Sequence, residues 1–247
     1  MGVLLLFLLT KGGTMMEGLA FSPIEKTISF YTRNDFAILN KLLAGDLDGL
    51  WNDAQLAYQD NQGIIDEYEN GIRSIDSDYD IKWLACLKER LIYQLDDETK
   101  ERIIATAKDD ISHILSAMTP ARERLSLFRT AWIDKGYDTG STYAYSRDYK
   151  AMEFTVGSAL EIETITSCSL TPYREDEDVG SDFYRYEICV PEGKNVLQLD
   201  GFVCHNEEGE VLLPPMRCKV TDIRNSTSKR CRKIIALEYM EQLPYKG

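Results

Sequence analysis

The first half of the chain carries apolar residues at the spacing of amphipathic helices. Between Phe21 and Met118 they recur three and four positions apart, with charged residues between them. Two of the resulting apolar stripes are Ile38, Leu39, Leu42 and Leu43, and Trp83, Leu84, Leu87 and Leu91. Turn-forming residues interrupt the pattern at positions 45–49, 70–71, 76–80 and 119–120. The pattern therefore predicts a lobe of four or five helices.

After Pro120 the apolar residues occur in short runs rich in β-branched and aromatic side chains, which are typical of strands. The predicted strands are residues 125–132, 159–165, 183–190, 195–199, 210–213, 218–223 and 233–239. Helices followed by strands, without alternation of the two, predict an α+β fold rather than a parallel doubly wound sheet. We expect residues 1–16 to be an unassigned segment, with a helical lobe at 17–120 and a β core at 121–247 that together make one domain.

Composition and charge narrow the classes of partner. A chain of 247 residues with 44% hydrophobic and 10% aromatic residues can bury a substantial core. Its formal net charge of -13 disfavours electrostatic binding to nucleic acid or to an anionic membrane, because both require a positive surface. A short basic cluster consists of Lys229, Arg230, Arg232 and Lys233, and we interpret it as a solvated strand edge. No nucleic-acid partner is expected.

The cysteines and the N-terminal residues leave the cellular location of the protein open. The six cysteines contain no CxxC pair, which favours reduced thiols, although pairing stays open if the protein matures outside a cell. The apolar run of residues 3–9 is too short to span a bilayer and lacks preceding basic residues, so it is a poor signal peptide. Met15 or Met16 are alternative starts. Export stays open, including delivery as a secreted effector that acts in a host cytosol.

Two metal-site templates match the sequence only in part. Residues 76–80 alternate carboxylates as a calcium loop does, but Ile81 stands where that loop needs Gly and Leu87 where it needs a bidentate Glu. Residues 205–207 have the His-x-Glu pattern of zinc deaminases, yet Cys218 is the one thiol where the second half of that signature needs two. We therefore expect no metal. A P-loop and a GxGxxG motif are also absent from the sequence.

Three short stretches of the second half carry the candidate chemistry. Arg129 lies in an apolar predicted strand, and small hydroxyl residues alternate over positions 165–169 at a strand end. Glu208 and Glu210 precede the apolar run of residues 211–213, and an extended chain would place both carboxylates on one face. Adjacent carboxylates repel each other, so a chain that needed only solubility would scatter them. Each stretch alone also fits a simpler role. Arg129 would extend its guanidinium to water, residues 165–169 would form a strand edge or turn, and Glu208 and Glu210 would lie in a solvated turn.

Taken in order, the three stretches resemble the mono-ADP-ribosyltransferases of the arginine-serine-glutamate class, which include bacterial exotoxins. The resemblance covers most of the chain. Before their core those proteins carry a helix of the form Tyr-Thr-x-x-x-aromatic-x-x-apolar-Asn-x-x-Leu, matched here by Tyr31, Thr32, Phe36, Leu39, Asn40 and Leu43. Arg129 resembles their NAD-binding arginine, residues 167–169 their Ser-Thr-Ser with Cys168 departing in the middle, and residues 208–210 their Glu-x-Glu.

The resemblance implies a fold and a reaction. The fold is a helical lobe followed by a mixed, mainly antiparallel β core of two sheets with an NAD cleft. The reaction is cleavage of the nicotinamide glycosidic bond of NAD, with transfer of ADP-ribose to an acceptor protein by a monomeric enzyme. Glu rather than Gln at position 208 implies arginine as the modified residue. An NAD glycohydrolase that uses water as acceptor, and a catalytically inactive binding module, remain alternatives.

The resemblance also assigns roles to single residues. Glu210 would stabilise the oxocarbenium-like centre and Ser167 would orient its carboxylate, while Glu208 would act on the acceptor. Arg129 would bind the diphosphate. The expected NAD-contacting residues are Arg129, Ser167, Ser169, Tyr173 and Phe183, and Phe202 is a candidate contact to the target protein. Thr130 and the acidic segment 174–178 depart from the family pattern and bear on how NAD is held.

Overall fold

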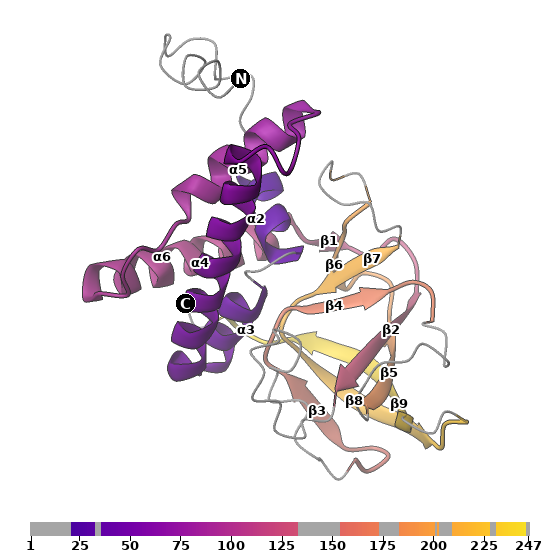
Figure 1. The fold of residues 1–247 in the computed structure, drawn as a ribbon. Coiled ribbons are helices and arrows are strands. Elements are labelled where there is room, and N and C mark those ends of the chain that lie inside the picture. Colours follow the sequence, from indigo (N-terminus) through magenta and orange to yellow (C-terminus); the bar gives the residue numbers. More distant parts are fainter. Residues whose placement is uncertain are drawn as a thin grey trace.

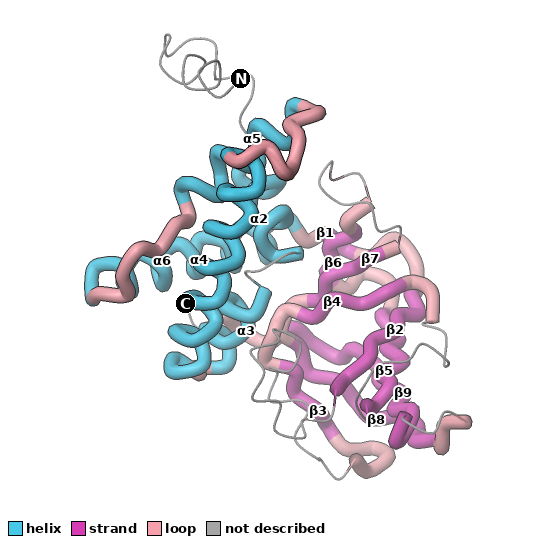
Figure 2. The backbone as a smooth tube through the Cα atoms, in the orientation of Figure 1, coloured by secondary structure: helices cyan, strands magenta, loops and turns pink. Residues whose placement is uncertain are grey.

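The computed structural model describes residues 21–32, 36–132, 154–172, 183–200, 202, 209–227 and 231–245. The helices of this part are α2 (Pro23–Phe30), α3 (Phe36–Ala44), α4 (Leu47–Glu69), α5 (Asp78–Glu89) and α6 (Asp97–Ala117). The strands are β1 (Thr119–Pro120), β2 (Leu125–Trp132), β3 (Ala159–Ile162), β4 (Thr166–Ser169), β5 (Phe183–Val190), β6 (Asn195–Gln198), β7 (Glu210–Leu213), β8 (Met216–Arg224) and β9 (Cys231–Gln242). The helices gather on one side and the strands on the other (Figures 1 and 2).

Side-chain caps define where the helices begin. Ser22 and Glu25 form a reciprocal capping box at α2, and Ser77 and Asp80 form a second one at α5. The Asp96 carboxylate accepts a hydrogen bond of 2.8 Å from the Thr99 N–H at the start of α6. The alternating carboxylates of residues 76–80, which resemble a calcium loop in sequence, thus include the acid that caps a helix. In the described ranges, no helix is long and apolar enough to span a membrane.

Hydrogen bonds connect the strands in the order β1-β6-β7-β4-β2-β5-β9-β8-β3. Of these pairs only β5 with β9 is parallel, so the prediction of an α+β fold with a mixed, mainly antiparallel β core is confirmed. One strand was predicted wrongly: residues 159–165 were expected to form a single strand, but β3 ends at Ile162 and residues 166–169 form β4, well inside the sheet. The predicted division into separate sheets and the domain boundary near residue 120 stay predictions.

The pairing between neighbouring strands of the sheet is shortest where β2 meets β4. These strands share one register pair, Phe128 with Ser169, whereas β2 pairs with β5 along its whole length from Leu125 to Trp132. On one side of this junction, strands β6 and β7 contribute residues both to the core of the sheet and to the core of the helical lobe. Val211 and Leu213 of β7 belong to the core of the sheet, while Leu212 between them packs into the core of the helical lobe. Strands β6 and β7 therefore lie between the helical lobe and the core of the sheet.

A polar clamp attaches the helical lobe to the start of β4. The Tyr31 hydroxyl donates a hydrogen bond of 3.2 Å to the Ile165 carbonyl, and the Ile165 N–H donates one of 3.0 Å to Asn40 Oδ1. All three residues are buried, with exposed fractions of 3%, 7% and 0% for Tyr31, Asn40 and Ile165. Burial raises the pKa of Tyr31 well above its usual range, so its hydroxyl stays protonated and remains a donor. The clamp fixes the residue that directly precedes β4.

Removing the amide of the clamp is expected to destabilise the fold. Asn40→Ala leaves the buried Ile165 N–H without its acceptor, which costs about 1–3 kcal/mol of unfolding free energy. Asn52→Ala, at an exposed position of α4, is the matched control and is expected to leave stability almost unchanged. Urea unfolding followed by circular dichroism measures both. Equal stability of the two variants would show that the clamp contributes nothing.

Candidate functional site

The candidate residues on β2, β4 and β7 come together because these strands are neighbours in the sheet. Ser169 of β4 pairs with Glu210 of β7 on one side and with Phe128 of β2 on the other. Arg129 follows Phe128 directly, so it lies at the junction of β2 and β4, where the strand pairing is shortest. Residues separated by about eighty positions in sequence therefore share one small region of the structure.

A hydrogen bond joins Ser167 to Glu210 at this junction. The Ser167 hydroxyl donates to Glu210 Oε1 across two neighbouring strands. Ser167 is the register partner of Leu212, so the contact is a diagonal one to the residue two positions earlier on β7. Both side chains are half-buried. The hydroxyl thus restricts the orientation of a carboxylate that still reaches the surface.

Arg129 supplies the positive charge of the region. Its Nη1 donates a hydrogen bond of 3.4 Å to the Ser167 carbonyl, and its side chain is half-buried. Arg129 and Glu210 both act electrostatically on the Tyr31 hydroxyl of the clamp, with opposite effects on its pKa. Both charged groups are therefore within electrostatic range of Tyr31. The site combines a fixed cation, a fixed anion and a hydroxyl next to the clamp that joins the two parts of the fold.

Cys168 separates the two serines without entering the site. Successive side chains of a strand point to opposite faces, and Cys168 packs into the core of the sheet with an exposed fraction of 2%. Burial is the main cause that raises the pKa of its thiol to about 12. A neutral thiol is a poor nucleophile. The departure from Ser-Thr-Ser thus falls on the buried face and leaves both serine hydroxyls on the opposite one.

A glycine directs the chain into Glu210. Gly209 has a φ of 82°, a region that residues with a Cβ rarely adopt. Its N–H donates to Asp200 Oδ1 at 3.0 Å, and its carbonyl accepts from the Leu170 N–H at 2.8 Å. A Cβ at this position would lie 3.4 Å from the side chain of Leu170. These contacts hold the residue before Glu210 against the loop after β4.

The other predicted site residues have varied surroundings. Glu208, Tyr173 and the segment 205–207 lie outside the described residues. Ser169 is half-buried beside Glu210, and its Oγ accepts a hydrogen bond of 3.1 Å from the Thr171 N–H. Phe183 is 3% exposed and packs with Cys231 and Ile234, so its expected contact with nicotinamide stays a prediction. Phe202 is half-buried against the helical core.

The sequence motif includes Tyr31 and Asn40 but predicts no structural role for either residue. Their contact with Ile165 spans 134 and 125 positions of the chain, which no local spacing could indicate. Asp200 was also missed, although an acidic residue followed by glycine is a turn signal. Among the described residues, no group of three or more His, Cys, Asp or Glu side chains could hold a metal ion.

The comparisons with known proteins identify the fold. No protein-family model and no curated protein matches the sequence. Among solved structures, the Salmonella SpvB ATR domain is 14% identical with a TM-score of 0.51, covering 90% of this chain and 100% of its own. Plx2a, an ADP-ribosyltransferase toxin from Paenibacillus larvae, is 14% identical with a TM-score of 0.49 over 91% and 89% of the two chains. The catalytic domain of VahC from Aeromonas hydrophila is 16% identical with a TM-score of 0.48, over 89% and 99%. The chain has the fold of the bacterial mono-ADP-ribosyltransferase toxins.

Proposed function

We propose that the chain is an NAD-dependent mono-ADP-ribosyltransferase that modifies an arginine side chain of an acceptor protein and releases nicotinamide. The observation that carries this proposal is the hydrogen bond between Ser167 and Glu210, beside Arg129, in a chain with the fold of such toxins. The three residue types in this arrangement supply what the reaction needs. They offer a grip for an anion, a negative charge for a developing cation and a group that orients that charge.

Arg129 is proposed to bind the diphosphate of NAD. A guanidinium can give a phosphate two parallel, charge-assisted hydrogen bonds, and the sequence has no P-loop to do so. The chain carries a net charge of -13, so an anionic substrate needs a local cation of this kind. Ser169, on the same strand as Ser167, is proposed to add a hydroxyl contact to the cofactor. Tyr173 and Phe183 are proposed as aromatic contacts to the nicotinamide end.

Glu210 is proposed to stabilise the transition state of NAD cleavage. As the bond between the ribose C1′ and the nicotinamide nitrogen breaks, its electron pair neutralises the pyridinium and positive charge develops on the ribose. A carboxylate held near that carbon by the Ser167 hydroxyl stabilises this charge without having to reorient. Ser167 is thus proposed to orient Glu210.

Glu208 is proposed to act on the acceptor. An arginine nitrogen of the target attacks C1′ from the side opposite to the leaving nicotinamide, and the proton that it loses goes to Glu208. Because the pKa of arginine is above about 12, the base takes the proton as the new bond forms. Phe202 is proposed to contact the target protein near this point. If water reached the same carbon first, the product would be free ADP-ribose and the chain would act as a glycohydrolase.

Replacing Glu210 with glutamine tests the catalytic assignment. Glu210→Gln keeps the shape of the side chain and removes its charge, so we expect nicotinamide release to fall about 100-fold or more while NAD still binds. Glu192→Gln, in an exposed turn, is the control and is expected to behave as the parent. Chromatography of released nicotinamide measures the rate. Release as fast as in the parent would refute the role of Glu210.

The second glutamate is expected to separate two activities. Glu208→Gln removes the proposed base for the acceptor but leaves Glu210 and Ser167 intact. Transfer of ADP-ribose to agmatine is therefore expected to be lost, whereas part of the hydrolysis of NAD remains. Both products can be quantified in one reaction. An equal loss of transfer and hydrolysis would assign Glu208 a role in the fold instead.

Arg129→Lys tests the grip on the diphosphate. Lysine keeps the charge but loses the planar pair of donors, so we expect the dissociation constant for NAD to rise about tenfold. Arg122→Lys at an exposed position is the matched control. Isothermal titration calorimetry with NAD measures both variants. Unchanged affinity in Arg129→Lys would mean that the diphosphate binds elsewhere, and a parent protein that does not bind NAD would favour an inactive binding module.

A further inference from the structure

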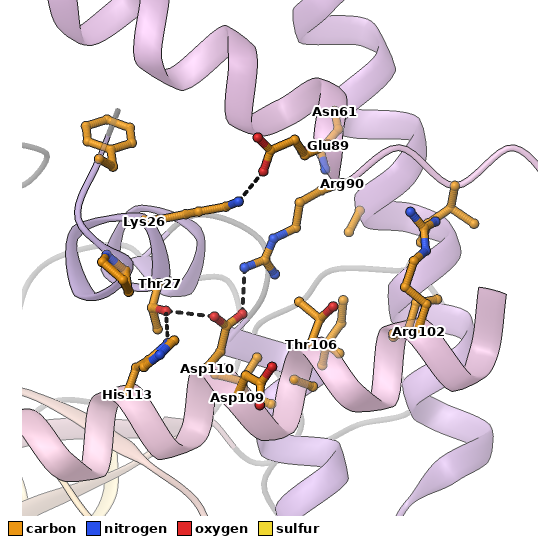
Figure 3. Close-up of a pocket in the computed structure, with 18 residues that line it drawn as sticks. Lys26, Thr27, Asn61, Glu89, Arg90, Arg102, Thr106, Asp109, Asp110 and His113 are labelled. Carbon is orange, nitrogen blue, oxygen red and sulfur yellow. Dashed lines mark hydrogen bonds and ion pairs between the residues drawn. The ribbon is translucent and has the colours of Figure 1, made fainter. Parts of the chain in front are cut away.

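The helical lobe contains a cavity of about 450 Å³ (Figure 3). Arg129, Ser167 and Glu210 are not among the residues that line it. Its volume lies in the range of small-molecule sites, which is about 300–1,000 Å³. The apolar part of its lining includes five residues of the buried core of the lobe, namely Ile38, Leu39, Ala57, Ile92 and Ala107. The cavity therefore offers an apolar surface to an occupant.

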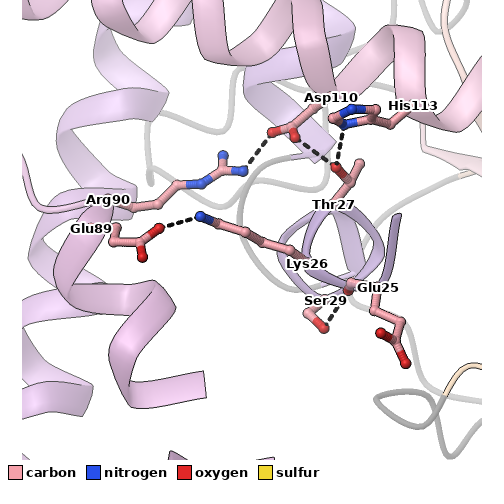
Figure 4. A network of polar contacts seen from close by, with 8 residues as sticks. All are labelled: Glu25, Lys26, Thr27, Ser29, Glu89, Arg90, Asp110 and His113. Atoms are coloured by element: carbon pink, nitrogen blue, oxygen red, sulfur yellow. Dashed lines mark hydrogen bonds and ion pairs between the residues drawn. The ribbon is translucent and has the colours of Figure 1, made fainter. Parts of the chain in front are cut away.

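A polar network forms one wall of the cavity and joins three segments of the lobe (Figure 4). Arg90 Nη2 donates to Asp110 Oδ2 at 2.6 Å, and the Thr27 hydroxyl donates to Asp110 Oδ1 at 2.7 Å. His113 Nδ1 lies 3.3 Å from the same hydroxyl oxygen. Because the one hydrogen of this hydroxyl goes to Asp110, His113 must carry a hydrogen on Nδ1 and donate it. Both oxygens of the buried Asp110 carboxylate therefore already have donors.

The charges around the cavity balance one another. Three basic side chains line it, Lys26, Arg90 and Arg102, and three acidic ones, Glu89, Asp109 and Asp110. Two of the pairs are already formed, Lys26 with Glu89 and Arg90 with Asp110. A charged ligand that left water for this cavity would thus meet no net opposite charge to repay its desolvation.

The remaining hydrogen-bonding groups suit a neutral ligand. Thr106 lies on the α6 wall between Arg90 and Arg102 (Figure 3), and its hydroxyl can both donate and accept. Arg102 is exposed, and the hydrogen bond of 3.1 Å from its Nη2 to the Leu91 carbonyl uses one of its five N–H donors. An apolar surface with a few convergent polar groups is the usual composition of a small-molecule site.

From this combination we propose that the cavity of the helical lobe binds an uncharged small molecule, with an apolar body and one hydrogen-bonding group. The body packs on the apolar lining around Ala107, and the polar group bonds with Thr106 or with Arg102 at the opening. This site is separate from the one proposed for NAD. It does not depend on the chain being a transferase, because binding is measured without NAD.

A series of three probes of one shape tests the proposal. 2-Naphthalenemethanol is neutral, 2-naphthoate is an anion and 2-naphthylmethylammonium is a cation at neutral pH. We expect the alcohol to shift backbone amide NMR signals of the cavity residues, with a dissociation constant at least about tenfold below that of either ion. Equal or tighter binding of one of the ions would overturn the proposal. So would the absence of binding by the alcohol at millimolar concentration, which would mean that the cavity holds only water.

Two cavity variants and one control locate the binding. Ala107→Leu fills part of the cavity from α6 and is expected to abolish binding of the alcohol, whereas Ala105→Leu, exposed on the same helix, is expected to retain it. If Ala107→Leu does not fold, as judged by circular dichroism, Thr106→Met replaces it with the same expected loss. Binding of the alcohol that survives in a folded cavity variant would place it elsewhere and refute the site.

Discussion

The two hydrogen bonds to Ile165 are the constraint on which the arrangement of the site depends. Buried backbone N–H and C=O groups need hydrogen-bond partners. The N–H and C=O of Ile165 bond to side chains of the helical lobe rather than to a neighbouring strand. The next residues form β4, which carries Ser167 and pairs with the strand of Glu210. The helical lobe therefore helps to position β4, the strand that carries Ser167.

The alternation of side chains along β4 explains why Cys168 lies outside the candidate site. Strand β4 has one face in the core of the sheet and the other toward the helical side, so its residues alternate between packing and exposure of a hydroxyl. Ser167 reaches Glu210 from the second face, while Cys168 fills the first. A thiol with a raised pKa behaves there as a small apolar group. The candidate chemistry of the region thus involves the carboxylate of Glu210, the hydroxyl of Ser167 and the guanidinium of Arg129.

Much of the fold could be predicted from hydrophobic periodicity. The predicted strands 125–132, 183–190 and 210–213 have the bounds found for β2, β5 and β7, because each is a short stretch rich in aliphatic and aromatic residues. Strand β4 was missed as an independent element, since its short hydroxyl side chains give no apolar signal and its extended form comes from pairing with two neighbours. The clamp and the helical cavity depend on contacts between distant segments. Local sequence patterns contain no information about such contacts.

The proposed function rests on whether ADP-ribose moves from NAD to a guanidinium. The most direct measurement is a product balance in which the purified chain is incubated with NAD and agmatine, and nicotinamide, free ADP-ribose and ADP-ribosyl-agmatine are quantified by mass spectrometry. A transferase acting on arginine releases nicotinamide and forms ADP-ribosyl-agmatine as the main ribosylated product. Nicotinamide with free ADP-ribose alone would identify a glycohydrolase, and the absence of nicotinamide would contradict an NAD-cleaving function for Arg129, Ser167 and Glu210.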